Sequence, residues 1–191
     1  MLVTMRKAAT MLALLLLASP AGVVVAGPAA AQTQSVELDS LFGKLRDPTI
    51  GSDAMRIERQ IWDNWLHQGS DAENEALAKA TLTMNIGDFK SADKMLTALV
   101  GASPNFAEAW NKRATLYFLM GRYDDSLSDI VKTLDLEPRH FGALAGRGMI
   151  YQRLGRDADA LAAFKDALAV NPTMMGAGMA VKELEKKSPE L

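Results

Sequence analysis

The 191-residue sequence contains no cysteine and only two histidines, His67 and His140. Without cysteine the chain has no disulfide, no thiolate zinc site and no cysteine nucleophile. The histidines lie far apart, and neither belongs to an HExxH pair, so no metal site is expected. The sequence also lacks a GxSxG elbow, a phosphate-binding loop and a dinucleotide fingerprint, and no cofactor is expected.

Clustered acidic residues have a structural explanation. The pairs Asp124–Asp125 and Asp157/Asp159 stand where helices are expected to begin, and a negative charge there complements the helix dipole. No catalytic residues are therefore predicted, and the protein is not expected to be an enzyme. An active site assembled from scattered acids is kept as an alternative hypothesis.

The sequence has little excess charge of either sign. Its formal net charge is -2, and loss of the N-terminal segment that carries Arg6 and Lys7 would take the charge to about -4. Binding to phosphate backbones depends on an excess of lysine and arginine. Nucleic acid is therefore not an expected partner.

The N-terminus has the pattern of a bacterial secretory signal peptide. Arg6 and Lys7 form a positive region, Met11–Ala18 is apolar, and the small residues Ala29–Ala31 precede Gln32. We predict a signal peptide over residues 1–31, cleavage near Ala31-Gln32 and a periplasmic location.

An uncleaved membrane anchor is the alternative interpretation of this segment. Pro20 and Gly22 interrupt its apolar run, which favours cleavage. No later segment is apolar enough to span a bilayer. The mature protein is expected to be soluble, without stable membrane insertion.

A 34-residue period runs through the rest of the chain. Three glycines and three prolines each recur at this interval, and every proline follows a glycine by 17 residues: Gly87, Gly121, Gly155, Pro104, Pro138 and Pro172. Repeated units of this length are typical of solenoids, in which each unit buries its apolar face against the next.

Each unit is predicted to be a pair of helices. In the segment 107–121, Trp110, Ala114, Tyr117 and Phe118 have the spacing of one helical face. The glycine of the unit ends the first helix, because glycine adopts the left-handed conformation easily. The proline ends the second helix, because proline cannot continue it.

This pattern resembles the tetratricopeptide repeat. The matching residues of the central unit are Trp110, Arg113, Ala114, Tyr117, Gly121, Tyr123, Ser126, Ile130 and Pro138. The resemblance implies an all-α fold, a right-handed α-solenoid of helix-turn-helix units. Its predicted repeats are residues 73–106, 107–140 and 141–174.

The ends of the solenoid are predicted from the same register. Residues 32–37 are expected to be flexible, and residues 38–72 to form a degenerate helical hairpin that covers the first repeat. In it, Trp62 and Trp65 fall in register with Leu96 and Leu99. Residues 175–191 are expected to form a capping helix and a loose tail.

The aromatic residues allow a second interpretation at two places. Trp110, Tyr117 and Phe118 are interleaved with cations, as on a surface that stacks nucleic-acid bases, but the repeat register predicts a structural role for Trp110 and Tyr117. Trp62 and Trp65 are likewise predicted to be buried, with an exposed docking surface as the alternative.

The resemblance implies a concave groove lined by the first helix of each repeat. The side chains expected to line it as a partner-binding site are Asn74, Leu77, Thr81, Met84, Asn111, Lys112, Thr115, Phe118, Arg139, His140, Met149, Gln152 and Arg153.

This predicted groove is chemically mixed. The Asn111 amide can donate to and accept from a peptide backbone, and methionines such as Met84 and Met149 adapt to apolar side chains of different shape. Lys112 and Arg153 are suited to acidic groups.

Some members of the family hold chaperone C-terminal carboxylates with a clamp of lysine, asparagine and arginine. The corresponding positions here are Leu77, Thr81, Lys112, Gly142 and Gly146, so the clamp is essentially missing. A cytosolic chaperone is therefore not an expected partner.

The sequence as a whole predicts a periplasmic, non-catalytic scaffold that captures a segment of an unidentified protein or peptide partner. The alternative is a self-associating protein of the cell envelope, a homo-oligomer that uses Trp62 and Trp65 or the terminal helix as its interface.

Overall fold

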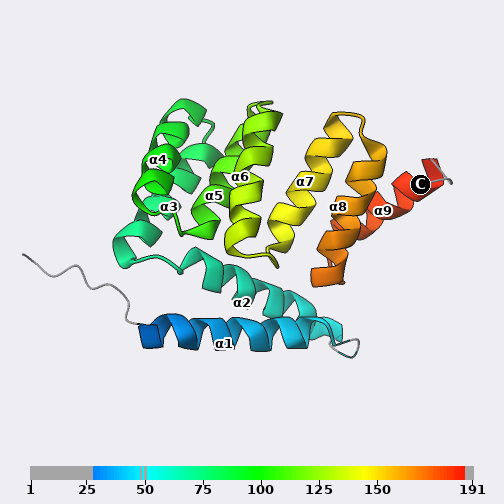
Figure 1. Ribbon diagram of the computed structural model, residues 1–191, viewed down its shortest axis with the longest axis horizontal. Coiled ribbons are helices and arrows are strands. Elements are labelled where there is room, and N and C mark those ends of the chain that lie inside the picture. Colours follow the sequence, from blue (N-terminus) through cyan, green and yellow to red (C-terminus); the bar gives the residue numbers. More distant parts are fainter. Residues whose placement is uncertain (1–27, 48, 50, 188–191) are drawn as a thin grey trace, which may run out of the picture.

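A computed structural model describes residues 28–187, except positions 48 and 50. This part of the chain is helical and contains no strand (Figure 1). The elements are α1 (Pro28–Leu45), the short 3-10 helix η1 (Gly51–Asp53), α2 (Ala54–Leu66), α3 (Asp71–Asn85), α4 (Phe89–Ala102), α5 (Ala107–Leu119), α6 (Tyr123–Leu136), α7 (Phe141–Arg153), α8 (Asp157–Val170) and α9 (Met175–Lys187).

Helices α3 to α8 form three antiparallel pairs stacked side by side, and α9 follows the third pair (Figure 1). The turn within each pair contains a glycine with a positive φ angle, 85° at Gly87, 73° at Gly121 and 70° at Gly155. A side chain would be strained in this conformation. The predicted all-α solenoid is confirmed, and the recurring glycines are its turns.

Small residues let the two helices of a pair approach closely. In the second pair the buried Ser126 hydroxyl donates to the Ala114 carbonyl oxygen at 2.7 Å. In the third pair a Cβ atom on Gly148 would lie 2.8 Å from the Phe164 ring. The fixed small residues of the repeat are therefore points of helix contact.

The N-terminal hairpin does not continue the stack. Helices α1 and α2 cross the lower edge of the solenoid, beneath the ends of the later helices (Figure 1). They pack against the start of the third repeat, where Phe42 and Trp65 contact Phe141. The prediction of a degenerate repeat that covers the first repeat is wrong, because the apolar surface that attracts the hairpin lies around Phe141.

The structure also changes the predicted start of the ordered chain. Residues 32–37, expected to be flexible, are helical within α1. The predicted cleavage point at Ala31-Gln32 therefore falls inside this helix. The predicted signal peptide otherwise lies outside the described residues, as does the end of the expected tail at 188–191. None of the helices in the described part combines the length and hydropathy that a membrane crossing requires.

Candidate functional site

A pocket of about 260 Å³ opens between the first helices of the second and third repeats. Helices α5 and α7 form its walls, and residues of α6 contribute to its lining. The lining is mainly apolar and consists of Asn111, Ala114, Thr115, Phe118, Ser126, Ile130, Gly142, Ala143, Ala145, Gly146, Met149, Ile150 and Met174.

The pocket exists because α7 carries small residues where it faces α5. Gly142 and Gly146 are one helical turn apart, and Ala145 lies beside them. A Cβ atom on Gly146 would have Ile130 Cδ1 as its nearest neighbour, at 3.7 Å, so space remains there for a side chain. Met149, 46% exposed, and the half-buried Phe118 add larger apolar groups.

The hairpin reaches the start of α7, beside this space. A Cβ atom on Gly142 would lie 2.5 Å from Cη2 of Trp62, so the α2 indole occupies the place of a side chain. Trp62 also packs edge-on against Trp65, His140 and Phe141. The N-terminal hairpin therefore packs against α7 next to the candidate site.

A buried carboxylate, Glu108, organises the polar residues beside the pocket. Asn111 Nδ2 donates to Glu108 Oε2 at 3.0 Å, and Lys112 Nζ lies 3.0 Å from Oε1. His140 Nε2 lies 2.9 Å from Oε2. The backbone N–H of Ala143 donates to His140 Nδ1 at 3.1 Å, so Nε2 carries the proton that is donated to Glu108.

The pKa of Glu108 reflects a balance between burial and these contacts. Burial by itself raises the pKa, because it disfavours the charged carboxylate. The hydrogen bond with His140 and the charge of Lys112 oppose this effect and hold the pKa below its ordinary value. Glu108 is therefore a buried carboxylate anion that ties α5 to the start of α7.

Four of the predicted groove residues come together at the pocket: Asn111, Thr115, Phe118 and Met149. Arg153 lies close by, in a shallow depression that it shares with Phe118. Gln152 is half-buried on the same helix, α7. These predicted residues therefore lie near one another on one surface of the solenoid.

Three predicted groove residues belong to the core instead. Leu77 and Met84 are buried in the cluster around α3 and α4, and His140 is buried between Glu108 and Trp65. These three assignments are wrong. A one-dimensional periodicity does not distinguish the side of the first helix that faces the groove from the side that faces its partner helices.

The remaining predicted residues are held in contacts within the chain. The Asn74 side chain closes the turn before α3 by hydrogen bonds to both backbone groups of Gly69. The Thr81 hydroxyl donates to the Leu77 carbonyl. Lys112 pairs with Glu108.

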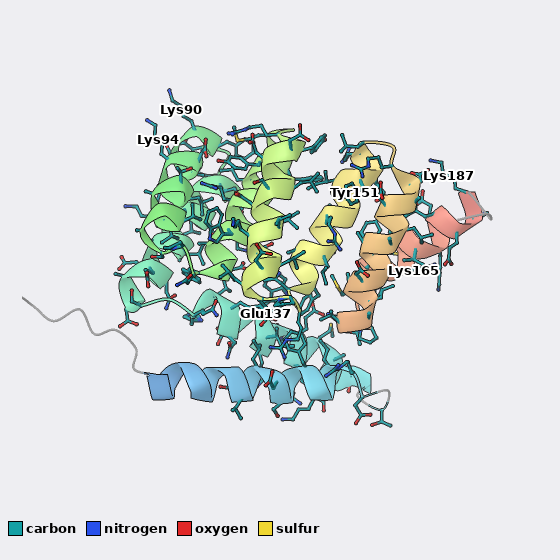
Figure 2. All side chains as sticks on the ribbon, in the orientation of Figure 1. Lys90, Lys94, Glu137, Tyr151, Lys165 and Lys187 are labelled. Atoms are coloured by element: carbon teal, nitrogen blue, oxygen red, sulfur yellow. The ribbon has the colours of Figure 1, made fainter. Side chains whose placement is uncertain are left out.

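Arg139 is also held within the chain, where it joins the end of α6 to the hairpin. It is paired with Glu137 and with Asp39 of α1, and its guanidinium lies over the Phe42 ring. Figure 2 places Glu137 between the solenoid and the hairpin.

The cations near Trp110, Tyr117 and Phe118 are likewise paired with acids. Arg113 forms a bidentate contact with Asp129, at 2.7 and 2.8 Å, and lies over the Trp110 ring. Arg122 pairs with Asp125 and Asp93. The arrangement supports the structural interpretation of this stretch over a base-stacking surface.

Sequence reasoning missed Gly142, Gly146 and Met174 as pocket residues. The two glycines were noticed only as positions where a clamp residue is missing. Glycine in a helix interior costs stability relative to alanine, so a pair four residues apart was an available signal of a close approach or an open space. Met174 precedes α9 and carried no such signal.

Comparison with known proteins identifies the family of the chain. A family model for the tetratricopeptide repeat matches residues 77–131 and 111–174. A TPR repeat-containing protein from Rhizobium etli is 34% identical over 170 residues, which span 89% of this chain and 83% of the relative. The chain belongs to the tetratricopeptide-repeat family.

Solved structures share the fold at lower sequence identity. The first tetratricopeptide domain of Spaghetti (RPAP3), bound to an HSP90 peptide, superposes with a TM-score of 0.60 at 18% identity and covers 64% of this chain and 97% of that domain. The MamA protein superposes with a TM-score of 0.57 at 16% identity over 83% of this chain and 84% of its own. These likenesses concern the fold.

Proposed function

We propose that this protein is a non-catalytic scaffold that captures an apolar segment of a partner protein in the pocket between α5 and α7. The observation that carries the proposal is the open, mainly apolar space beside Gly146. Binding is non-covalent and involves no chemical step. The titratable side chains of Glu108 and His140 beside the pocket are fully buried.

The size of the pocket supports a peptide ligand. Small-molecule sites usually measure about 300–1,000 Å³. The volume here, about 260 Å³, lies just below that range and suits one or two large apolar side chains of a longer segment. Phe118 and Met149 offer an aromatic and a deformable contact to such side chains.

The chemistry of the pocket argues against an acidic C-terminal ligand. The RPAP3 domain binds an HSP90 peptide, but the clamp positions of this chain include Gly142 and Gly146. Lys112, the remaining cation at those positions, is paired with Glu108. The proposed ligand is therefore apolar, and hydrophobic burial supplies most of its binding free energy.

The variant Gly146→Leu tests the proposal by filling the pocket. Leucine is a good helix former, and the space beside Gly146 can take a side chain, so α7 should stay intact. The matched control is Gly43→Leu, at a mid-helix glycine of α1 with open space around it. Both proteins would first be compared by circular dichroism.

Partner capture from a periplasmic extract would then be quantified by mass spectrometry. We expect partners that the wild type and Gly43→Leu capture to be lost with Gly146→Leu. If Gly146→Leu retains the same partners in the same amounts, the pocket is not the binding site.

We also propose that the protein is exported to the periplasm. The first support is the N-terminal sequence pattern. The second is that cleavage at Ala31-Gln32 would keep the buried α1 residues Leu38 and Phe42 in the mature chain. The test is expression of the full coding sequence, cell fractionation and mass measurement of the N-terminus. A mature start at Gln32 in the periplasmic fraction is expected, and an intact N-terminus in the cytosol would contradict the proposal.

A further inference from the structure

The first repeat exposes a helix face whose counterpart is buried in every later repeat. Leu82 of α3 is 66% exposed. The residues at the same position of α5, α7 and α9 are Leu116, Ile150 and Leu184, which are 0%, 0% and 3% exposed. In the later repeats the preceding helix pair covers this position, whereas α3 has no preceding pair because the hairpin lies elsewhere.

A second position of the repeat shows the same contrast. Ala109, Ala143 and Ala177 are buried, whereas the corresponding residue of α3 is the exposed Glu75. Glu75 and Leu82 are seven residues apart and so lie on one side of the helix. With Asp71 and with Ile86, the residue that directly follows the helix, they form the outer face of α3. This face is apolar toward the C-terminal end of the helix and acidic toward its N-terminal end.

Helix α9 presents a complementary stripe at the other end of the solenoid. Ala177, Val181 and Leu184 pack against α8. On the opposite side Met175 and Met179 are 79% and 66% exposed, and Lys182 and Lys186 follow them. We call these four residues the outer face of α9.

The two lysines of this face form no ion pair with any described residue, and their neighbour Lys187 pairs with Asp157. Lys187 is labelled at the end of α9 in Figure 2. The outer face of α9 is therefore apolar toward its N-terminal end and basic toward its C-terminal end.

We propose that the outer face of α9 in one copy of this chain docks antiparallel on the outer face of α3 in another copy. An alignment that sets Leu82 against Met175 also sets Glu75 against Lys182 and Asp71 against Lys186. The match arises because both helices space these residues by seven and then four positions. Apolar groups meet at one end, and opposite charges meet at the other.

The contact gives each helix a neighbour on its open side. Leu82 gains the cover that Leu116 and Ile150 have from the preceding repeat, and Met175 and Met179 are removed from water. The two faces differ, so the contact is heterologous, and repeated use of it produces an open chain of solenoids. The inference is independent of the pocket between α5 and α7.

Light scattering during size-exclusion chromatography tests this assembly. The protein would be purified from the full coding sequence without a C-terminal tag. We expect the wild-type mass to rise with concentration beyond that of a dimer. Leu82→Glu and Met175→Glu should each remain monomeric, because each disables one end of every copy. Val131→Glu, at an exposed position on α6, is the control and should associate like the wild type.

A mixture of the two end variants distinguishes head-to-tail docking from other contacts. An equimolar mixture of Leu82→Glu and Met175→Glu retains one compatible pair of ends, so it should form a dimer and nothing larger. If the wild type stays monomeric at high concentration, or if the mixture stays monomeric, the proposal is wrong. It is also overturned if Leu82→Glu abolishes association but Met175→Glu does not, because α3 would then pair with α3.

Exchange of charges tests the alignment itself. Glu75→Lys would face Lys182 with a like charge, and Lys182→Glu would face Glu75 in the same way, so each variant should associate more weakly. The double variant restores the opposite pair and should recover association. A double variant no better than the single ones would contradict the register.

Discussion

Glu108 links the two helices that form the candidate site. Its carboxylate is buried and is held by Asn111, Lys112 and His140, while the His140 ring stacks on Trp65 of the hairpin at a centroid distance of 4.0 Å. A buried charge is tolerated only when its partners satisfy it, so removal of one partner is costly. The position of α5 relative to α7 therefore depends on this cluster.

Glu108→Gln should lower the free energy of unfolding by about 2 kcal/mol, because the amide keeps the shape but leaves Lys112 without its ion-pair partner. The measurement is urea denaturation at neutral pH. Glu183→Gln, on the exposed part of α9, is the control and should change stability by less than about 0.5 kcal/mol. Equal effects of the two variants would show that the Glu108 contacts contribute little.

The same carboxylate should make stability depend on pH in the acid range. Its pKa is lower in the folded protein than the usual value of 4.5, so the unfolded chain takes up the proton first as the pH falls. The stabilisation is complete above about pH 4.5 and is lost as the pH falls through the folded pKa. Other carboxylates titrate there too, so the wild type is compared with Glu108→Gln. The difference in unfolding free energy between them should shrink below about pH 4.5, and a constant difference would contradict this.

At the scale of single elements, α7 shows that neighbouring glycines have different roles. Gly146 borders the pocket, and its nearest neighbour would be 3.7 Å from an added Cβ atom. Gly148 faces α8, where an added Cβ atom would lie 2.8 Å from the Phe164 ring. The first glycine leaves space open, and the second permits two helices to touch.

Alanine at these two positions should change stability in opposite directions. Gly146→Ala should stabilise the protein by about 1 kcal/mol, because alanine is the better helix former and has room. Gly148→Ala should destabilise it by about 1–3 kcal/mol, because the methyl group overpacks a buried contact. Thermal unfolding followed by circular dichroism measures both. A shift of the same sign in the two variants would show that one environment is described wrongly.

The hairpin of α1 and α2 depends on a few large side chains. Trp65 is 1% exposed and packs against Phe42, His140 and Phe141. Trp65→Ala should cost about 3–5 kcal/mol, as expected for removal of a buried tryptophan. Urea denaturation measures this cost. Met55→Ala, at an exposed position of α2, is the control and should be nearly neutral. A small effect of Trp65→Ala would mean that the hairpin is not docked as described.

These elements also show what the sequence could predict. The helix pairs of the repeats followed from glycines and prolines that act locally and recur every 34 residues. The position of the hairpin could not be predicted in this way, because it depends on contacts of Trp65 with His140 and Phe141, which are far from it in the chain. Burial of both tryptophans was predicted, and the structure buries Trp65 and half-buries Trp62.

The candidate site was predicted in part for a similar reason. Thr115, Phe118 and Met149 project from first helices, and the repeat register placed them together. Gly142 and Gly146 contribute by the absence of a side chain, which a search for ligand-binding groups overlooks. Lys112 was expected to meet a ligand, but its partner is Glu108, whose burial could not be read from the helical period.

At the scale of the whole molecule, the solenoid has an open pocket on the side of its first helices and an exposed helix face at each end. The hairpin crosses one edge and leaves both end faces uncovered. This arrangement keeps the two proposed contacts apart, one with a partner segment at the pocket and one with further copies at α3 and α9.

The most direct test of the central claim is site-specific photo-crosslinking in cells that express the full-length protein. A photoreactive phenylalanine analogue would replace Met149 at the pocket or Val131 on α6, which are 46% and 55% exposed. We expect a discrete crosslinked partner from position 149 that disappears when Gly146→Leu is added, and no such product from position 131. Equal products from both positions, or a product at 149 that survives Gly146→Leu, would contradict capture at this pocket.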